Sequence, residues 1–320
     1  MARVVLTARV PGGAAGRLAA AHDLVHRDVD SPTPRAELLA AVAGADALAC
    51  MLVDRVDDEL LDAAGPALRV VANVAVGHDN VDVAACRARG VVVTNTPGVL
   101  TDATADLAIA LTLMTTRRLG AAERRVRTGE PWGWSMTGGL GTGLRGKVFG
   151  VVGPGAIGLA TARRAVALGM EVALSGRSEP DPVAVDRLGA RVVGLDELFE
   201  TADVVSLHCP LTPQTHHLVD AGRLASMKPS AHLVNTARGP VVDEAALVRA
   251  LEAGVIAGAG LDVFEDEPRV HPGLLAREDV VLLPHVGSAT VETRAAMADL
   301  AADNVLAVLA GQEPLTPVRG

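Results

Sequence analysis

Three side chains that can hold an anion or move a proton occur in the last third of the chain. Arg238 lies in NTARGP, Glu267 in VFEDEP and His285 in LLPHVG. A guanidinium can bind a carboxylate, an imidazole can transfer a proton, and a carboxylate can orient that imidazole. Each residue follows a predicted strand as it runs into a turn, which is the edge where open α/β sheets bind ligands.

A glycine pattern upstream provides a partner for this chemistry. Gly153, Gly155 and Gly158 form G-x-G-x-x-G directly after the apolar run KVFGVV and directly before the helical stretch ATARRAVALG. In a strand–turn–helix setting the glycines allow a tight turn, close approach to a pyrophosphate and close helix packing. Backbone N–H groups at the helix start, including those of Ala156 and Ile157, would face the anion. We therefore expect a dinucleotide site here.

The end of the next predicted strand bears on the choice of dinucleotide. Where NAD-binding chains keep an acid for the ribose hydroxyls, this chain has Gly176, Arg177 and Ser178. Arginine can bind a phosphate in bidentate fashion and serine can donate to it, a gain of about 1.5–3 kcal/mol. We predict a preference for NADP, with NAD as the alternative. The other reading is an ordinary polar turn before Pro180, and Glu179 would weaken a phosphate site if it faced inward.

With a nicotinamide cofactor, the three side chains suit the reduction of a 2-oxo acid. The imidazolium would protonate the carbonyl oxygen as hydride reaches carbon, and the carboxylate would favour the protonated ring. Glu265 and Asp266 are rivals for Glu267. Among the other histidines, His22 and His26 are expected on a helix surface, and His216 and His217 in a polar turn. No metal centre is expected.

At this point the chain resembles the D-isomer-specific 2-hydroxyacid dehydrogenases, from ALACMLVDRVDDELLD almost to its end, with several motifs in family order. Within that family it looks nearest to the glyoxylate/hydroxypyruvate reductases. The resemblance implies that Arg238 binds substrate, Glu267 is the relay carboxylate and His285 the acid/base. It also implies that N–H groups around Val76 and Gly77 hold the substrate carboxylate.

The resemblance further implies cofactor contacts. Asp262 would orient the nicotinamide amide, Thr236 and Ala237 would line the nicotinamide pocket, and HCPLTPQT (208–215) would follow the ribose and pyrophosphate. The residues carried over as cofactor-binding are Gly153, Gly155, Ala156, Ile157, Gly158, Gly176, Arg177, Ser178, Cys209, Pro210, Thr215, Thr236, Ala237, Asp262 and Gly287. Pro154, Ala156 and Asp106 depart from the usual family pattern. Ala156 removes one side-chain contact to phosphate.

The alternation of apolar runs and helical stretches predicts two doubly wound parallel-sheet α/β domains, a Rossmann cofactor domain and a flavodoxin-like substrate domain with a cleft between them. TADLAIALTLMTTRRLG is expected to be one long helix. A final helix, with Met297, Leu300, Ala301, Val305 and Val308 on one face, would return to the first domain. The predicted bounds are 1–99 with 290–320 for the substrate domain and 100–289 for the dinucleotide domain.

Composition limits the partners. The formal charge is −9 and the sequence has no basic run, which argues against nucleic acid. No run approaches the ~18 apolar residues of a membrane helix, and the N-terminal apolar segment is short for a signal peptide. The cysteines Cys50, Cys86 and Cys209 have no metal or disulfide spacing, so we expect a reducing cytoplasm.

The segment EPWGWSMTGG (130–139) carries both tryptophans. In relatives this arm and the preceding helix build the dimer, so a homodimer is expected. Trp132 or Trp134 either seals a partner's active site or anchors the interface only. For the function as a whole, two alternatives to a small 2-oxo acid stay open. One is a bulkier substrate such as 2-ketogluconate, and the other is a non-catalytic, nucleotide-sensing protein.

Overall fold

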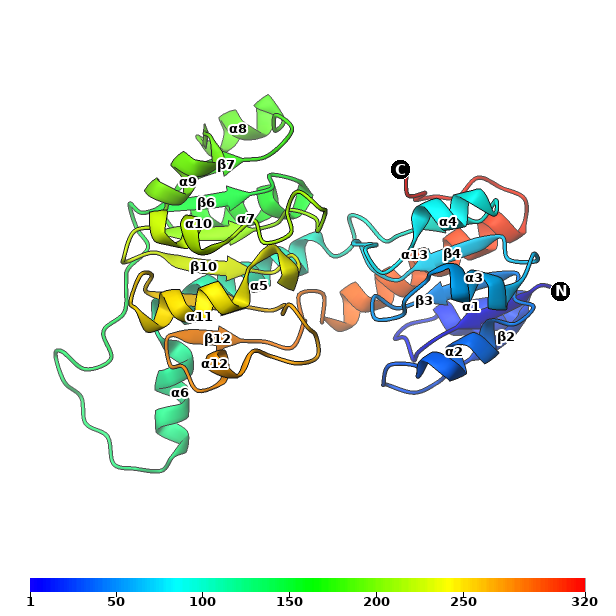
Figure 1. Ribbon diagram of the computed structural model, residues 1–320, viewed down its shortest axis with the longest axis horizontal. Helices are drawn as coiled ribbons and strands as arrows, with labels where there is room; N and C mark the ends of the chain where they lie inside the picture. Colours follow the sequence, from blue (N-terminus) through cyan, green and yellow to red (C-terminus); the bar gives the residue numbers. More distant parts are fainter. Residues whose placement is uncertain (320) are drawn as a thin grey trace. The chain divides into compact units, whose positions relative to one another are not determined.

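The computed structural model describes residues 1–319 and divides into two compact units (Figure 1). The first contains Met1–Leu100 together with the residues from Ser288 onward, and the second contains Thr101–Gly287. Both are parallel sheets flanked by helices. The predicted fold class is confirmed.

The first unit has a five-stranded sheet in the order β2-β1-β3-β4-β5, which is the flavodoxin-like order. The last long helix, α13, packs on this unit, against α1 and the strands β3 and β4. The elements are β1 (Arg3–Leu6), α1 (Ala14–Ala21), β2 (Asp23–His26), α2 (Arg35–Val42), β3 (Ala47–Cys50), α3 (Asp58–Ala64), β4 (Val70–Asn73), α4 (Val83–Ala88), β5 (Val92–Thr94) and α13 (Val291–Leu309).

The second unit has a seven-stranded parallel sheet in the order β12-β11-β10-β9-β6-β7-β8. Strand order reverses between β6 and β9, the switch point at which such sheets bind ligands. The strands are β6 (Val148–Val152), β7 (Glu171–Ser175), β8 (Arg191–Val192), β9 (Val204–Leu207), β10 (His232–Asn235), β11 (Gly258–Leu261) and β12 (Val280–Leu282). The helices are α5 (Thr101–Thr116), α6 (Leu119–Arg127), α7 (Ala156–Ala167), α8 (Pro182–Leu188), α9 (Leu195–Thr201), α10 (Ala221–Ser226), η1 (Gly239–Val241), α11 (Glu244–Glu252) and α12 (Pro272–Leu275).

Each face of the second sheet has its own aliphatic core. Helices α5 and α7 cover one face, and α9, α10 and α11 cover the other (Figure 1). Because neighbouring strand residues point to opposite faces, Leu233 packs with α9–α11 and Val234 with α5 and α7. Burial on both faces explains why these strands are continuous apolar runs that can be found in the sequence.

Three local predictions were wrong. His26 lies in β2, a strand that the sequence analysis did not include, and not on a helix. The predicted long helix ends at Thr116, and α6 begins after Arg118, whose φ of 53° lies in the left-handed region. The apolar run ARVVG (190–194), which the alternation predicts to be a strand, forms only the two-residue strand β8, which is exposed at the sheet edge.

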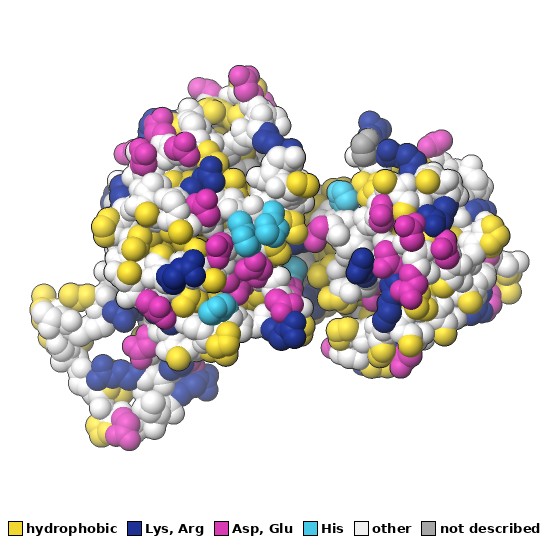
Figure 2. All heavy atoms as spheres, in the orientation of Figure 1, with side chains coloured by type: hydrophobic (Ala, Val, Ile, Leu, Met, Phe, Trp, Pro, Cys, Tyr) yellow, Lys and Arg dark blue, Asp and Glu magenta, His cyan; other side chains and the backbone are white. Residues whose placement is uncertain are grey.

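The surface mixes both signs of charge. Figure 2 shows acidic and basic side chains interspersed on the visible faces, with apolar side chains between them, some of them in small groups. Within residues 1–319, the helices are too short or too polar for any of them to cross a membrane. Cys50, Cys86 and Cys209 are all buried and free.

Candidate active site

The glycine turn joins β6 to α7. Gly153 has a φ of 93°, and a Cβ there would lie 2.7 Å from the backbone nitrogen of Cys209. A Cβ on Gly158 would collide with the carbonyl oxygen of Gly153. No side chain caps the start of α7 at Gly155. The turn therefore excludes side chains where helix and strand meet, and it leaves the helix N-terminus to the backbone of Ala156 and its neighbours, as an anion site requires.

The end of β7 leads into the predicted 2′-phosphate residues. Gly176, Arg177 and Ser178 are all exposed. A Cβ on Gly176 would lie 2.7 Å from Cδ of Pro154, so the proline ring occupies the space that an acidic side chain would need. Burial raises the pKa of the Cys209 thiol to about 11, although the charge of Arg177 opposes this shift. Gly176 therefore lies against the glycine turn.

The loop after β9 is fixed by its own threonine. The hydroxyl of Thr215 donates to the carbonyl of Pro210 at 2.6 Å and accepts from the N–H of Thr212 at 2.8 Å. At the start of this loop, burial lowers the pKa of His208 to about 4. Its Nε2 lies 2.9 Å from the hydroxyl of Ser206. The structure therefore gives Thr215 the task of shaping the loop that carries Cys209 and Pro210.

His285 and Glu267 form a direct pair. Nδ1 of His285 lies 2.8 Å from Oε2 of Glu267, and Oε1 of Glu267 accepts the N–H of Phe264 at 3.0 Å. Burial tends to raise the pKa of Glu267. The bond and charge of His285, together with the charge of Arg238, hold that pKa below its ordinary value. His285 itself adopts a φ of 54° and donates its N–H to the carbonyl of Asp262 at 2.8 Å.

Arg238 lies in a turn that packs tightly on the loop of Glu267. The amide of Asn235 donates to the carbonyl of Arg238 at 2.9 Å, and its oxygen accepts the N–H of Ala237 at 3.0 Å. A Cβ on Gly239 would collide with the backbone of Phe264 and Glu265. Sequence reasoning did not single out Asn235 or Gly239. The glycine directly after the arginine is the signal that could have indicated a close backbone contact.

Asp262 has a structural task besides its predicted one. It is 1% exposed, and its two oxygens accept the N–H groups of Val286 and Gly287, both at 2.8 Å. Burial raises the pKa of this carboxyl, while the two N–H bonds and the charge of His285 oppose the rise. Asp262 thus fixes the turn that carries His285. Nearby, the buried hydroxyl of Thr236 has no hydrogen-bond partner among the described residues, which fits a polar ligand group there.

The predicted substrate loop lies in the first unit and is held by amides. The carbonyl of Val76 accepts from Asn95 at 2.7 Å, and the carbonyl of Gly77 accepts from Asn73 at 2.8 Å. Asn80 in turn bonds to Asn73 and to the carbonyl of Asp54. The side-chain amides therefore fix the orientation of both peptide planes. These three asparagines could not be identified from a local pattern, because each acts on backbone at least four residues away.

Comparison with known proteins gives the family. The model for the D-isomer specific 2-hydroxyacid dehydrogenase, NAD binding domain, matches residues 109–287. The glyoxylate reductase of Thermococcus litoralis is 45% identical over 318 residues, which is 98% of this chain and 95% of that protein. The glyoxylate reductase of Thermococcus kodakarensis is 49% identical over 290 residues, covering 89% and 86%.

Solved structures agree with this assignment. The glyoxylate reductase from Paecilomyes thermophila superposes with a TM-score of 0.89 at 34% identity, covering 99% of this chain and 98% of that one. The NADPH-dependent glyoxylate/hydroxypyruvate reductase from Sinorhizobium meliloti, in complex with NADP and malonate, gives 0.85 at 39% identity, covering 99% and 96%. The resemblance noted from the motifs is thus confirmed. The chain belongs to the D-isomer specific 2-hydroxyacid dehydrogenases and is an NAD(P)-dependent oxidoreductase.

Proposed function

We propose that the protein reduces a small 2-oxo acid, glyoxylate or hydroxypyruvate, to the D-2-hydroxy acid with NADPH, and that His285 is the proton donor. The observation that carries the proposal is the 2.8 Å contact between Nδ1 of His285 and Glu267. With Nδ1 directed at the carboxylate, Nε2 is the nitrogen left to protonate the carbonyl oxygen. Glu267 keeps its negative charge and so stabilises the imidazolium.

The substrate carboxylate is assigned to Arg238 and to the loop of Val76 and Gly77. A guanidinium forms bidentate bonds with a carboxylate, and it also polarises the adjacent carbonyl. In the loop, the asparagines hold the two carbonyls, which orients the N–H groups of the same peptides for an anion. The guanidinium and the oriented backbone donors each favour a substrate that has a carboxylate next to the ketone.

The cofactor is assigned to the glycine turn and the strand ends around it. When bound, the nicotinamide supplies the hydride that reduces the carbonyl carbon. The backbone at the start of α7 would hold the pyrophosphate, Arg177 and Ser178 would hold the 2′-phosphate, and Thr236 would line the nicotinamide pocket. Two features support NADP over NAD. Gly176 itself carries no carboxylate, and Pro154 leaves no room for one at that position.

The substrate class is supported by the relatives, since those named above are glyoxylate or glyoxylate/hydroxypyruvate reductases. A bulkier 2-oxo acid would use the same relay. A non-catalytic nucleotide sensor would need no proton donor paired to a carboxylate, and the Glu267–His285 contact argues against it.

We further propose a homodimer in a reducing cytoplasm. The segment 130–141 projects beyond α6 (Figure 1), and it exposes Trp132, Trp134, Met136 and Leu140 by 63%, 82%, 77% and 66%. Four large apolar side chains exposed on one short segment favour a partner that covers them. The N–H of Thr142 donates to the carbonyl of Thr116 and closes the base of the arm.

Three buried free cysteines suit a reducing compartment.

The test is a panel of 2-oxo acids, assayed with NADH and NADPH side by side. We expect the highest kcat/KM for glyoxylate or hydroxypyruvate with NADPH. The best rate with 2-ketogluconate would move the assignment to the bulkier substrate, and no turnover with any 2-oxo acid would favour the sensor. His285→Ala should lose about two to four decades of kcat while binding NADPH normally. Unchanged turnover would remove His285 from the mechanism.

A further inference from the structure

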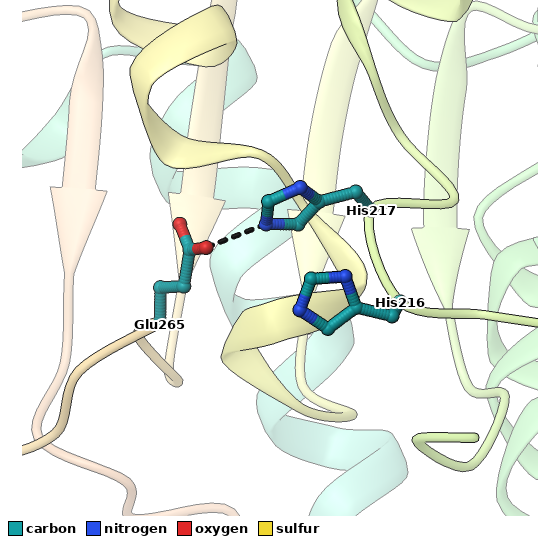
Figure 3. Close-up of side chains that lie close together, drawn as sticks. All are labelled: His216, His217 and Glu265. Atoms are coloured by element: carbon teal, nitrogen blue, oxygen red, sulfur yellow. Dashed lines mark hydrogen bonds and ion pairs between the residues drawn. The ribbon is translucent and has the colours of Figure 1, made fainter. Parts of the chain in front are cut away.

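Two histidines and a glutamate outside the relay come together on the second unit. Figure 3 shows the rings of His216 and His217 one above the other, with the carboxylate of Glu265 facing them. Nε2 of His217 lies 2.5 Å from Oε1 of Glu265, and the two ring centroids are 4.1 Å apart. One ligand atom from each residue lies within 4.8 Å of the other two.

The backbone positions of both histidines are fixed. The N–H of His216 donates to the carbonyl of Thr212 at 2.9 Å, and the N–H of His217 donates to the carbonyl of Pro240 at 2.8 Å. His217 has a φ of 50°, a conformation that non-glycine residues adopt at a cost. The ring of this strained, half-buried residue points at Glu265.

Glu265 is oriented in the same way by a second carboxylate. The backbone N–H of Glu265 donates to Oε1 of Glu244 at 2.6 Å, and the backbone N–H of Glu244 donates to Oε2 of Glu265 at 3.3 Å. Glu244 is 5% exposed, so its position is set by the protein interior. Outer contacts of this kind orient the ligands of a metal site. They leave Oε1 of Glu265 directed at the histidines.

From this arrangement we infer a binding site for a divalent transition-metal ion of the Zn²⁺ class, with His216, His217 and Glu265 as ligands and an open fourth position. Two imidazole nitrogens and one carboxylate oxygen are a donor set that zinc accepts. Zinc holds such atoms at about 2 Å, hence roughly 3–3.5 Å apart. The exposed ring of His216 can rotate to this spacing. The net charge of −9 favours a cation. The sequence analysis predicted only a polar turn at these histidines, because Glu265 lies 48 residues beyond His217.

The ion would tie two loops together. His216 and His217 lie in the loop between β9 and α10, and Glu265 lies two residues before Glu267 in the loop that follows β11. Binding only to the folded chain would raise the thermal midpoint with ion concentration. Because imidazole must be deprotonated to bind a metal, affinity should fall as the solution is acidified.

The experiment titrates metal-free protein, without cofactor or substrate, with Co²⁺ and then with Zn²⁺. One saturable site per chain is expected, with the strong visible bands of four- or five-coordinate Co²⁺ and no thiolate charge-transfer band, since all three cysteines are buried. Zn²⁺ should displace Co²⁺ and raise the thermal midpoint. Because neither cofactor nor turnover is involved, failure here is distinguishable from failure of the proposed reductase activity.

The variants decide which side chains bind the ion. His216→Ala, an exposed change, and Glu265→Gln should each weaken Co²⁺ binding by about tenfold or more. The matched control is Asp266→Asn, whose carboxylate pairs with Arg269 next to the site and should leave affinity unchanged. Wild-type affinity in His216→Ala, an equal loss in the control, or a weak octahedral spectrum would each overturn the inference.

Discussion

The ring of Pro154 stands where a side chain at Gly176 would have to go. An added Cβ at residue 176 would lie 2.7 Å from Cδ and 3.3 Å from Cγ of the proline. The two residues belong to different turns, one after β6 and the other after β7. The proline in the glycine turn and the glycine at the strand end are therefore sterically coupled, because a larger residue at position 176 would collide with the proline ring.

From the contact between Pro154 and residue 176 we predict that Gly176→Asp alone does not change the cofactor preference from NADPH to NADH. The new side chain meets Pro154, so kcat/KM with NADPH should fall by about one to two decades without a matching gain for NADH. Adding Pro154→Ala should make room and raise kcat/KM for NADH. Arg163→Ala, a change at an exposed arginine elsewhere in Thr101–Gly287, serves as the control and should leave the cofactor preference unchanged. Efficient NADH use by the single variant would show that the ring gives way.

Glu267→Gln tests the relay while keeping the size of the side chain. The amide can still contact His285 but no longer stabilises the imidazolium. We expect kcat to fall by roughly two to four decades. NADPH binding and the thermal midpoint should stay close to wild type, which separates loss of the relay from misfolding. A kcat within a few-fold of wild type would remove the carboxylate of Glu267 from the relay.

Gly239→Ala should disturb the arginine turn. Its methyl group would collide with the backbone of Phe264 and Glu265, which cannot rotate away. We expect a loss of about 1–3 kcal/mol in the free energy of unfolding, with reduced kcat/KM for the 2-oxo acid. Gly194→Ala is the matched control, since a Cβ there meets nothing within 4 Å. Thermal unfolding and activity of the two variants are compared. Equal stability would contradict the contact.

Acid should destabilise the second unit through its neutral histidines. Burial lowers the pKa of His232 and of His208 to about 4, from 6.5. Between about pH 6.5 and pH 4 these two histidines are therefore protonated in the unfolded chain but neutral in the folded chain. Stability from this source is complete above about pH 6.5 and is lost as the pH falls toward 4, by up to a few kcal/mol. Urea unfolding at several pH values measures it, and His232→Leu should flatten the slope. A wild-type slope in that variant would exclude His232.

The features predicted from the sequence were those with a strong local pattern. Buried strands are apolar on both faces, and the glycine turn has fixed spacing, so both could be located without coordinates. β2 could not be located, because its four residues DLVH are half polar. The break after Thr116 has no glycine or proline to mark it.

Contacts between distant segments escaped prediction for a different reason. The meeting of Pro154 with Gly176, of Gly239 with Phe264 and of His217 with Glu265 depends on where neighbouring strands end. Strand order and register set these distances, and neither can be read from one sequence. The same holds for Asp262, whose bonds to Val286 and Gly287 arise because β11 and β12 are adjacent.

The protein contains no tyrosine, and both of its tryptophans lie on the exposed arm between α6 and β6. Its near-ultraviolet emission therefore originates almost entirely outside the two aliphatic cores. A blue shift on concentrating the protein would report a second copy covering the arm, without any introduced label. Conversely, unfolding of either core would leave that emission largely unchanged. Thermal scans monitored by tryptophan fluorescence would therefore report assembly and not unfolding of the cores.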